Sequence, residues 1–368
     1  MLKGVKVLDM SRVLAGPLCG MMLGDLGADV IKVERPSWGD ESRQWGPPFD
    51  DRGESAYYLS CNRNKLSIAL SLHEPTDLTV LRHLIAGADV VLDNFKVGTL
   101  ERRGIDPLES LSHYPALIWC TITGFGAQSD RPGYDYVVQA ESGWMSITGE
   151  VEGDPMKTGV ALADVLAGKD AAIAILGALT ARGLGHTRLP KQRHLFVSLA
   201  HVATAALVNV AQNTLVSGSP AKRWGNAHPN LVPYQLFRAT DRGLVIAVGS
   251  DAQWRGCCRA LGLAHLTADP GLATNSGRLT RRETVVAAIA ARIAERSAAD
   301  WQAALGAEGV PCGVIRSVAE ALERVEASAL TGIAPPVPGS VRRAPPRLDE
   351  HGPLIREMGW GAFGTPSA

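Results

Sequence analysis

One carboxylate stands alone in an apolar helical segment. Asp164 lies in Gly159–Gly168, at the start of a stretch rich in Ala, Ile, Leu and Gly. A helix start favours negative charge, so the first interpretation of Asp164 is a cap or first-turn residue. The setting also suits a nucleophile, because the dipole keeps the carboxylate ionised, small neighbours leave room for a substrate, and backbone N–H groups could hold an oxyanion. A free Asp has a pKa of about 3.9, so it would need no base.

Cations follow the ends of several predicted strands, where open α/β sheets bind ligands. The segments expected at that edge are 11–17, 34–36, 94–96 and 123–126. The cations that would form a basic rim there are Arg12, Arg35, Lys65, Lys96 and Arg102. Such a rim suits a phosphorylated ligand, for example a nucleotide or coenzyme A. For any one of these residues taken alone, a solvated surface cation is the better interpretation.

Several familiar catalytic motifs are missing. No complete GxGxxG follows the first predicted strand, and there is no P-loop, GxSxG or HExxH. The nine histidines are dispersed and the six cysteines form no CxxC pair. We therefore expect no metal, nicotinamide or flavin.

The elements that would position these groups alternate along the first half of the chain. β-branched runs separated by helical patterns give parallel pairing and right-handed crossovers. The predicted strands cover 5–10, 29–33, 89–93 and 116–122, and the predicted helices cover 17–26, 74–86 and 107–113. The fold class predicted is α/β, with a doubly wound, Rossmann-like parallel sheet in a large domain.

The second half has a different pattern. The stretch 159–182 is apolar nearly all round and should form a buried helix, and 201–216 is expected to be another apolar helix. A smaller α+β domain is predicted from a strand at 243–248 and helices at 252–261, 281–295 and 299–306. The proline-rich tail after Thr331 should wrap over a surface.

Bulk properties exclude some classes of partner. The 368 residues contain 37 Lys plus Arg and 37 Asp plus Glu, so the chain has no net charge to attract nucleic acid or an anionic membrane. We find neither a secretory signal pattern nor an apolar run of the roughly 20 residues that span a bilayer. A cytoplasmic protein is expected.

Motifs spread over nearly the whole chain resemble those of family III CoA-transferases. They are Val7-Leu8-Asp9, Ala15-Gly16-Pro17, 23–36 (LGDLGADVIKVERP), Asn62-Arg63-Asn64-Lys65, Asp93-Asn94-Phe95, Pro132-Gly133-Tyr134-Asp135, the Asp164 segment, 233–237 (PYQLF) and 347–351 (RLDEH). The resemblance places the family's nucleophilic aspartate on Asp164. It implies coenzyme A contacts at Val13, Leu14, Arg35, Lys65, Asn94, Phe95, Lys96, Arg102 and Tyr134.

The resemblance also implies an interlocked, ring-like homodimer that binds an acyl-CoA and a carboxylic acid. Its domains would be a large CoA-binding domain over 1–190, a connecting helix and linker over 191–224, a small α+β domain over 225–325, and a segment over 326–368 that returns to the large domain.

Among branches of the family, the chain is most similar to the dicarboxylate type represented by succinyl-CoA–glutarate CoA-transferase. The residues that carry this similarity are Arg12, 45–49 (WGPPF) and 221–225 (AKRWG). Arg12 and Arg223 are candidates to grip the far carboxylate of a dicarboxylic acyl group; a surface salt bridge is the alternative for each. Phe196 and Lys169-Asp170 depart from the family pattern.

Transfer would proceed through an aspartyl anhydride and an aspartyl-CoA thioester on Asp164. One alternative is an acyl-CoA racemase of the same fold, which the resemblance disfavours because Tyr134 stands where racemases carry a histidine base. Another is a coenzyme A-binding protein without catalysis. The identities of donor and acceptor are left open.

Overall fold

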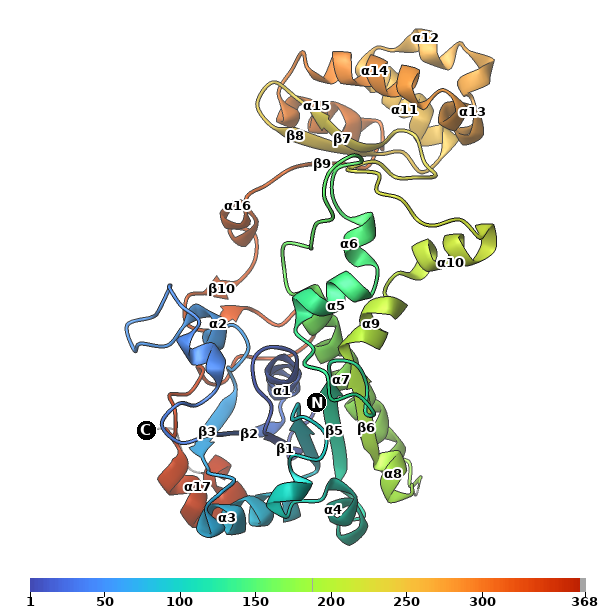
Figure 1. The fold of residues 1–368 in the computed structure, drawn as a ribbon. Helices are drawn as coiled ribbons and strands as arrows, with labels where there is room; N and C mark the ends of the chain where they lie inside the picture. Colours follow the sequence, from blue (N-terminus) through green and yellow to red (C-terminus); the bar gives the residue numbers. More distant parts are fainter. Residues whose placement is uncertain (187, 365–368) are drawn as a thin grey trace. The chain divides into compact units, whose positions relative to one another are not determined.

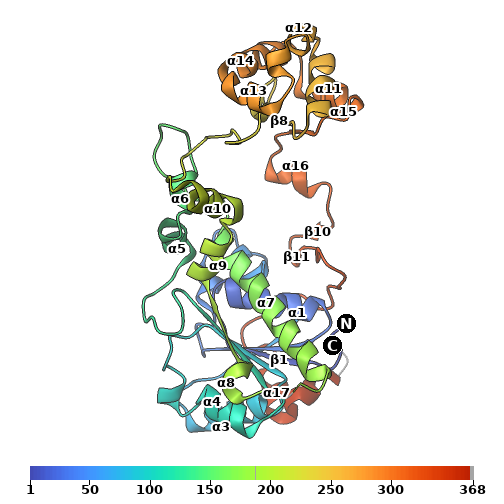
Figure 2. The same cartoon turned by 90° about the vertical axis from the view of Figure 1, so that its right-hand side faces the viewer.

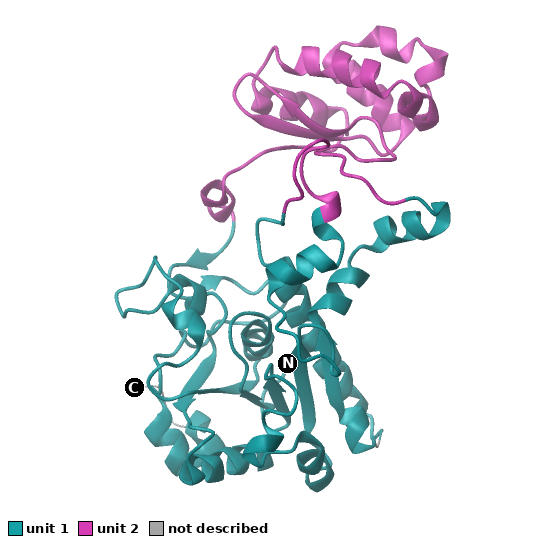
Figure 3. Ribbon diagram, in the orientation of Figure 1, with its two compact units in different colours: residues 1–145, 157–219, 325–368 teal, residues 146–156, 220–324 magenta. Residues whose placement is uncertain are grey.

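The computed structural model describes residues 1–186 and 188–364. The chain divides into two compact units, which Figure 3 colours separately. Unit 1 comprises 1–145, 157–219 and 325–368, and unit 2 comprises 146–156 and 220–324. The boundaries of the contiguous domains predicted from the sequence differ from those of these units. Residues 146–156 and 220–224 belong to unit 2, whereas 191–219 and Val325 belong to unit 1.

Unit 1 is built on a six-stranded sheet in which every strand pair is parallel, as predicted. Its strands are β1 (Lys6–Asp9), β2 (Asp29–Glu34), β3 (Lys65–Ala69), β4 (Val90–Asp93), β5 (Ile118–Thr123) and β6 (His194–Ser198). Their order is β3-β2-β1-β4-β5-β6. Successive strands are therefore added on one side of β1 as far as β3 and on its other side from β4 onward, so the strand order reverses between β1 and β4. β3 and β6 were missed by the sequence analysis. β6 lies in the segment predicted to be a connecting linker.

Helices cover both faces of this sheet (Figures 1 and 2). The helices of unit 1 are α1 (Ala15–Asp25), α2 (Ala56–Leu59), α3 (Pro75–Ala86), α4 (Pro107–His113), α5 (Asp135–Glu141), α7 (Leu162–Gly183), α8 (Pro190–Arg193), α9 (Leu199–Ala205), α10 (Val208–Ser217) and α17 (Gly352–Met358). The short helix α6 (Trp144–Ile147) runs across the boundary between unit 1 and unit 2. Short 3-10 turns are η1 (Glu41–Gln44), η2 (Glu101–Arg103) and η4 (Gly359–Gly364), and a small hairpin pairs β10 (Ala327–Ser328) with β11 (Gly332–Ile333).

Alternating side chains along the strands feed two separate cores. Val7 of β1 packs with α1 and α7 on one face, whereas its neighbour Leu8 packs with α3, α4 and α17 on the other. The same alternation makes the strands buried on both sides, so they read as continuous apolar runs in the sequence.

The helix predicted over 201–216 is broken into α9 and α10, which meet at an angle of 69°. The helix is interrupted at Ala206 and Leu207, and Val208, the first residue of α10, has a φ of 40°. Within the described residues no single helix is both long and apolar enough to cross a bilayer, and α9 with α10 meets that criterion only as a bent pair.

Unit 2 has an antiparallel three-stranded sheet in the order β7-β8-β9 with helices around a core that contains Trp254 and Trp301. Its strands are β7 (Tyr234–Arg238), β8 (Gly243–Ala247) and β9 (Cys312–Val314). Its helices are α11 (Asp251–Leu261), α12 (Ala264–Thr267), η3 (Pro270–Leu272), α13 (Asn275–Thr280), α14 (Arg282–Ile293), α15 (Ala298–Ala307) and α16 (Val318–Leu322).

Candidate functional site

A cavity of about 340 Å³ opens at the carboxyl ends of β1, β4 and β5, beside the start of α7. This is where the strand order reverses, the position at which open α/β sheets bind ligands. Its walls come from the turn after β1, the turn after β4, the loop after β5 and the α7 terminus. The lining residues are Arg12, Val13, Leu14, Ala15, Asn94, Phe95, Lys96, Val97, Ile122, Thr123, Gly124, Ser129, Asp130, Arg131, Pro132, Gly133, Tyr134, Asp164 and Leu199.

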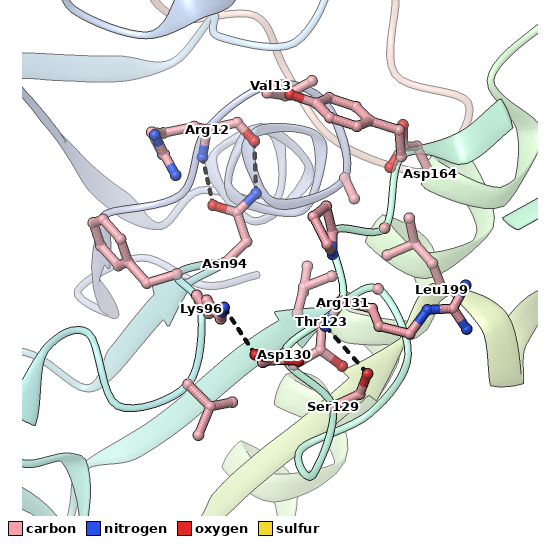
Figure 4. A pocket seen from close by; sticks show the side chains of 18 of the residues that line it. Arg12, Val13, Asn94, Lys96, Thr123, Ser129, Asp130, Arg131, Asp164 and Leu199 are labelled. Carbon is pink, nitrogen blue, oxygen red and sulfur yellow. Dashed lines mark hydrogen bonds and ion pairs between the residues drawn. The ribbon is translucent and has the colours of Figure 1, made fainter. Parts of the chain in front are cut away.

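Asp164 lies in the first turn of α7, half-buried, and borders this cavity near Leu199 (Figure 4). Gly168, one turn further along, brings α7 against the start of α1. A Cβ on Gly168 would lie 2.5 Å from the carbonyl oxygen of Ala15, so only glycine allows this approach. The close packing sets the Asp164 carboxylate opposite the turn after β1.

The cap of α7 comes from Asp135 and not from Asp164. The Asp135 Oδ1 atom accepts the backbone N–H groups of Ala163 at 2.8 Å and Asp164 at 3.3 Å. Asp135 is itself held by Gln139, whose Nε2 donates to Oδ2 at 2.6 Å. The interpretation of Asp164 as a helix cap is therefore wrong, and its carboxylate forms no hydrogen bond or ion pair with the part of the chain that the structure describes.

The same contacts leave no free N–H in the first turn of α7. Leu162 N donates to the Val160 carbonyl at 2.8 Å and Val165 N to the Ala161 carbonyl at 3.1 Å, while Asp135 takes the two N–H groups between them. An oxyanion held by these groups, which the sequence suggested, does not fit this arrangement.

The pKa of Asp164 is raised from 3.8 to about 7. Burial is the larger cause, because removal from water disfavours the charged form, and the nearby carboxylate of Asp135 adds repulsion. The sequence analysis expected the helix dipole to keep Asp164 ionised, whereas a pKa of about 7 leaves about half of the carboxyl groups protonated at pH 7. Groups with strongly shifted pKa values are concentrated at functional sites.

The turn after β1 and the turn after β4 are tied together. Asn94 Oδ1 accepts the Arg12 N–H at 2.9 Å, and Asn94 Nδ2 donates to the Arg12 carbonyl at 2.7 Å, the two dashed lines between these residues in Figure 4. The Arg12 guanidinium lies 5.4 Å from the Phe95 ring centroid. Asn94 therefore shapes the cavity wall by holding the backbone of Arg12.

Three cations border the cavity, and each is paired with a carboxylate. Arg12 contacts Glu41 at 2.8 Å, Lys96 contacts Asp130 at 3.1 Å, and Arg131 forms two hydrogen bonds with Glu141. These pairs are partly exposed, so each is weak enough to exchange its carboxylate for an anionic ligand. The sequence analysis gave a surface salt bridge as the alternative role of Arg12, and the structure contains such a salt bridge, with Glu41.

Eight residues predicted for the site border this one cavity: Arg12, Val13, Leu14, Asn94, Phe95, Lys96, Tyr134 and Asp164. Arg35, Lys65, Arg102 and Arg223 do not. Arg35 donates to the Gly39 carbonyl at 3.1 Å, and Arg102 donates to Thr99 Oγ1 at 3.1 Å, both from exposed positions.

The position predicted for Lys65 on a basic rim is wrong. Its ammonium is fully buried and donates to Asp9 Oδ2, the Pro17 carbonyl and Asn62 Oδ1, each at 2.8 Å. A buried ammonium must be paired, and Asp9 supplies the countercharge beneath the sheet edge. Lys65 thus holds the start of α1 to β1 and β3.

Arg223 lies in unit 2, whereas the cavity lies in unit 1. Its Nε donates to the Glu150 carbonyl at 3.0 Å and its Nη2 to the Gly153 carbonyl at 2.7 Å. These bonds connect 146–156 to Arg223 within unit 2.

The two departures from the family pattern lie at the surface of unit 1. Phe196 on β6 is 44% exposed and its ring lies 4.1 Å from that of His194. Lys169 and Asp170 are both exposed on α7, on the side away from the buried alanines. Neither borders the cavity that Asp164 lines.

The sequence analysis did not single out Asp135 as the cap of α7, or Asp130 and Arg131 as residues that line the cavity. Asp135 could have been found as the acidic residue of the Pro132–Asp135 motif, but nothing in the sequence shows that its partner is the α7 terminus. Among the described residues no group of three His, Cys, Asp or Glu side chains is arranged to hold a metal ion.

Comparison with known proteins shows what this chain is similar to. The family described as CoA-transferase family III matches residues 2–352. A succinate–glutarate CoA-transferase of Agrobacterium fabrum is 40% identical, with 95% of this chain and 93% of the relative covered. A succinyl-CoA:glutarate CoA-transferase of Mus musculus is 41% identical over 88% of this chain and 74% of its own. The crystal structure of a CAIB/BAIF family protein from Brucella suis superposes with a TM-score of 0.85 at 38% identity, covering 96% of this chain and 98% of that one.

Proposed function

The chain belongs to family III of the CoA-transferases, and from that premise we propose that Asp164 carries first an acyl group and then coenzyme A during transfer between two carboxylic acids. One observation carries this proposal. Asp164 is the cavity-lining carboxylate that has no partner within the described residues, so it is available as a nucleophile.

The proposed first half-reaction conserves both atoms and charge. The Asp164 carboxylate attacks the thioester carbonyl, the C–S bond breaks, and an acyl–aspartyl anhydride and the CoA thiolate form. The thiolate attacks the aspartyl carbonyl, and the donor acid leaves as a carboxylate. An aspartyl-CoA thioester remains on Asp164.

The acceptor then repeats these steps in reverse. Its carboxylate attacks the aspartyl thioester and releases the thiolate, which attacks the acceptor's acyl carbon and restores the Asp164 carboxylate. No proton is transferred, so only the ionised fraction of Asp164 reacts. Water would hydrolyse both intermediates, and the half-buried position of Asp164 limits its access.

For the substrates, we propose a dicarboxylic acyl-CoA such as succinyl-CoA as donor. Relatives that are 40 and 41% identical carry names with succinate or succinyl-CoA and glutarate. Arg12 borders the cavity and its Nε has no hydrogen-bond partner, so Arg12 is the candidate to bind the far carboxylate. Val13, Leu14, Asn94, Phe95, Lys96 and Tyr134 are the proposed coenzyme A contacts.

We also propose a cytoplasmic homodimer as the working form, as the family resemblance implies. Light scattering after gel filtration should give twice the chain mass of 39.0 kDa. A species of one chain mass that transfers coenzyme A would contradict the dimer.

The covalent scheme is tested by trapping. The protein is incubated with succinyl-CoA and quenched with hydroxylamine, which attacks either aspartyl intermediate to leave a hydroxamate. Peptide mass should place the hydroxamate on Asp164, and Asp164→Asn should lose both trapping and transfer. Asp170→Asn, on the exposed side of the same helix, is the matched control and should retain both.

Transfer that survives in Asp164→Asn without any hydroxamate would rule out this scheme. A racemase would instead exchange deuterium at the α-carbon of an acyl-CoA in the absence of an acceptor acid. A protein that binds coenzyme A without catalysis would show neither product.

A further inference from the structure

The turn between β1 and α1 has a backbone conformation that its residue type disfavours. Val13 has a φ of 72°, in the left-handed region where a β-branched side chain is a steric outlier. Such strain persists only where surrounding groups over-determine the backbone, and it gathers at ligand sites. Val13 borders the cavity between Arg12 and Leu14, and no chemical step of transfer uses it.

A buried ion pair grips this turn on both sides of Arg12. The Val13 N–H donates to the two carboxylate oxygens of Asp40 at 3.1 and 3.2 Å. Lys32 Nζ donates to Asp40 Oδ2 and to the Ser11 carbonyl, each at 3.0 Å. The side chains of Lys32 and Asp40 are fully buried, so this pair is neither screened by salt nor free to rearrange.

Other side chains complete the grip. Asn94 bonds both the N–H and the carbonyl of Arg12, and Cys61 Sγ lies 3.7 Å from the Val13 carbonyl oxygen. Every backbone polar group from the Ser11 carbonyl to the Val13 carbonyl therefore meets a side chain. A turn anchored in this way is fixed before a ligand arrives, which reduces the entropy lost on binding.

We propose that Lys32 and Asp40 are positioning residues for acyl-CoA, because they hold Val13 in its left-handed conformation and so fix Arg12 and Leu14 as one wall of the pocket. The nature of the ligand rests on the proposed function. Neither Lys32 nor Asp40 borders the cavity, so both act through the backbone of the turn. An ion pair that served stability alone would not depend on which residue occupies position 13.

The test is a double-mutant cycle of Val13→Gly and Asp40→Asn, read as the Kd of coenzyme A by calorimetry. With valine at 13, Asp40→Asn should weaken binding by about tenfold, because the strained turn loses its holder. With glycine at 13, the same change should cost about twofold or less, since glycine reaches positive φ without a steric penalty. Equal factors in the two backgrounds would overturn the inference.

Asp106→Asn is the matched control. Asp106 caps α4 through the N–H groups of Leu108 and Glu109 and does not border the cavity, so its Kd should equal that of the wild type.

Because Asp40→Asn leaves Lys32 without its counter-ion, a second measurement avoids changing Asp40. At position 13 the Tm of Val13→Gly should equal or exceed that of Val13→Ala. At Val97, which borders the same cavity with an ordinary φ, the glycine variant should melt below the alanine variant. If the glycine variant has a lower Tm than the alanine variant at both positions, the inference that the backbone of Val13 is strained is wrong. If the wild-type protein binds no coenzyme A, the proposed function is refuted. This outcome differs from a failure of the double-mutant cycle and from a failure of the Tm comparison.

Discussion

Asp135 accepts the backbone N–H of Asp164 at 3.3 Å and at the same time repels the carboxylate of that residue. One side chain thus fixes the helix terminus that carries the proposed nucleophile and raises its pKa. The two effects have the same origin, because a charge close enough to cap the first turn is also close enough to oppose a second charge in it.

The first prediction concerns pH. Since the pKa of Asp164 is about 7, kcat/KM for acyl-CoA should fall about tenfold per pH unit well below 7 and level off above it. Asp135→Asn removes the repulsion but keeps a capping oxygen, so the acid limb should shift to lower pH. A profile measured from pH 5 to 9 with an unshifted limb in Asp135→Asn would show that Asp135 does not set this pKa.

The second prediction concerns stability. The folded chain binds the Asp164 proton more tightly than the unfolded chain, so ionisation opposes folding as pH rises from about 4 to about 7. The Tm of Asp164→Asn relative to wild type should rise across that range and then stay constant, at about 1–2 °C per kcal/mol for a chain of this size. Asp170→Asn should show no such trend. A pH-independent difference in calorimetry would argue against a buried ionisation at Asp164.

The third prediction separates two lysines. Lys65→Ala leaves Asp9 buried without its partner and should cost about 3–5 kcal/mol of stability, while the folded fraction keeps its affinity for coenzyme A. Lys96→Ala should leave Tm unchanged and weaken coenzyme A binding about threefold or more, because Lys96 borders the cavity. Thermal melts measure the stability of both variants, and calorimetry measures their affinity for coenzyme A. The reverse pattern would mean that Lys65 contacts coenzyme A and that Lys96 does not.

The fourth prediction concerns acyl selectivity. Arg12→Gln should lower the ratio of kcat/KM for succinyl-CoA over butyryl-CoA by about tenfold, since only succinyl-CoA offers a far carboxylate. Arg223→Gln should leave this ratio unchanged, because two of its donor atoms already bind the carbonyls of Glu150 and Gly153. A loss of selectivity in Arg223→Gln would mean that Arg223 exchanges these bonds for the substrate.

Local pattern was sufficient wherever the determining interactions are close in sequence. The strands around Val7, Val30 and Val90 follow from apolar runs, and the position of Asp164 at the start of a helix follows from the apolar stretch behind it. The break of the predicted helix before Val208 does not follow, because that stretch is as apolar as a continuous helix would be.

The sequence by itself determined the parallel α/β class, four of the six strands, the family, and a carboxylate at the start of a helix, since periodicity and motif identity can be read without knowledge of contacts. Only the tertiary structure decided which charges meet. Lys65 pairs with Asp9, which lies 56 positions away in the sequence, and Asp135 caps the helix of Asp164 from 29 positions away. Burial and distance set pKa and pairing, and both arise only when distant segments pack together.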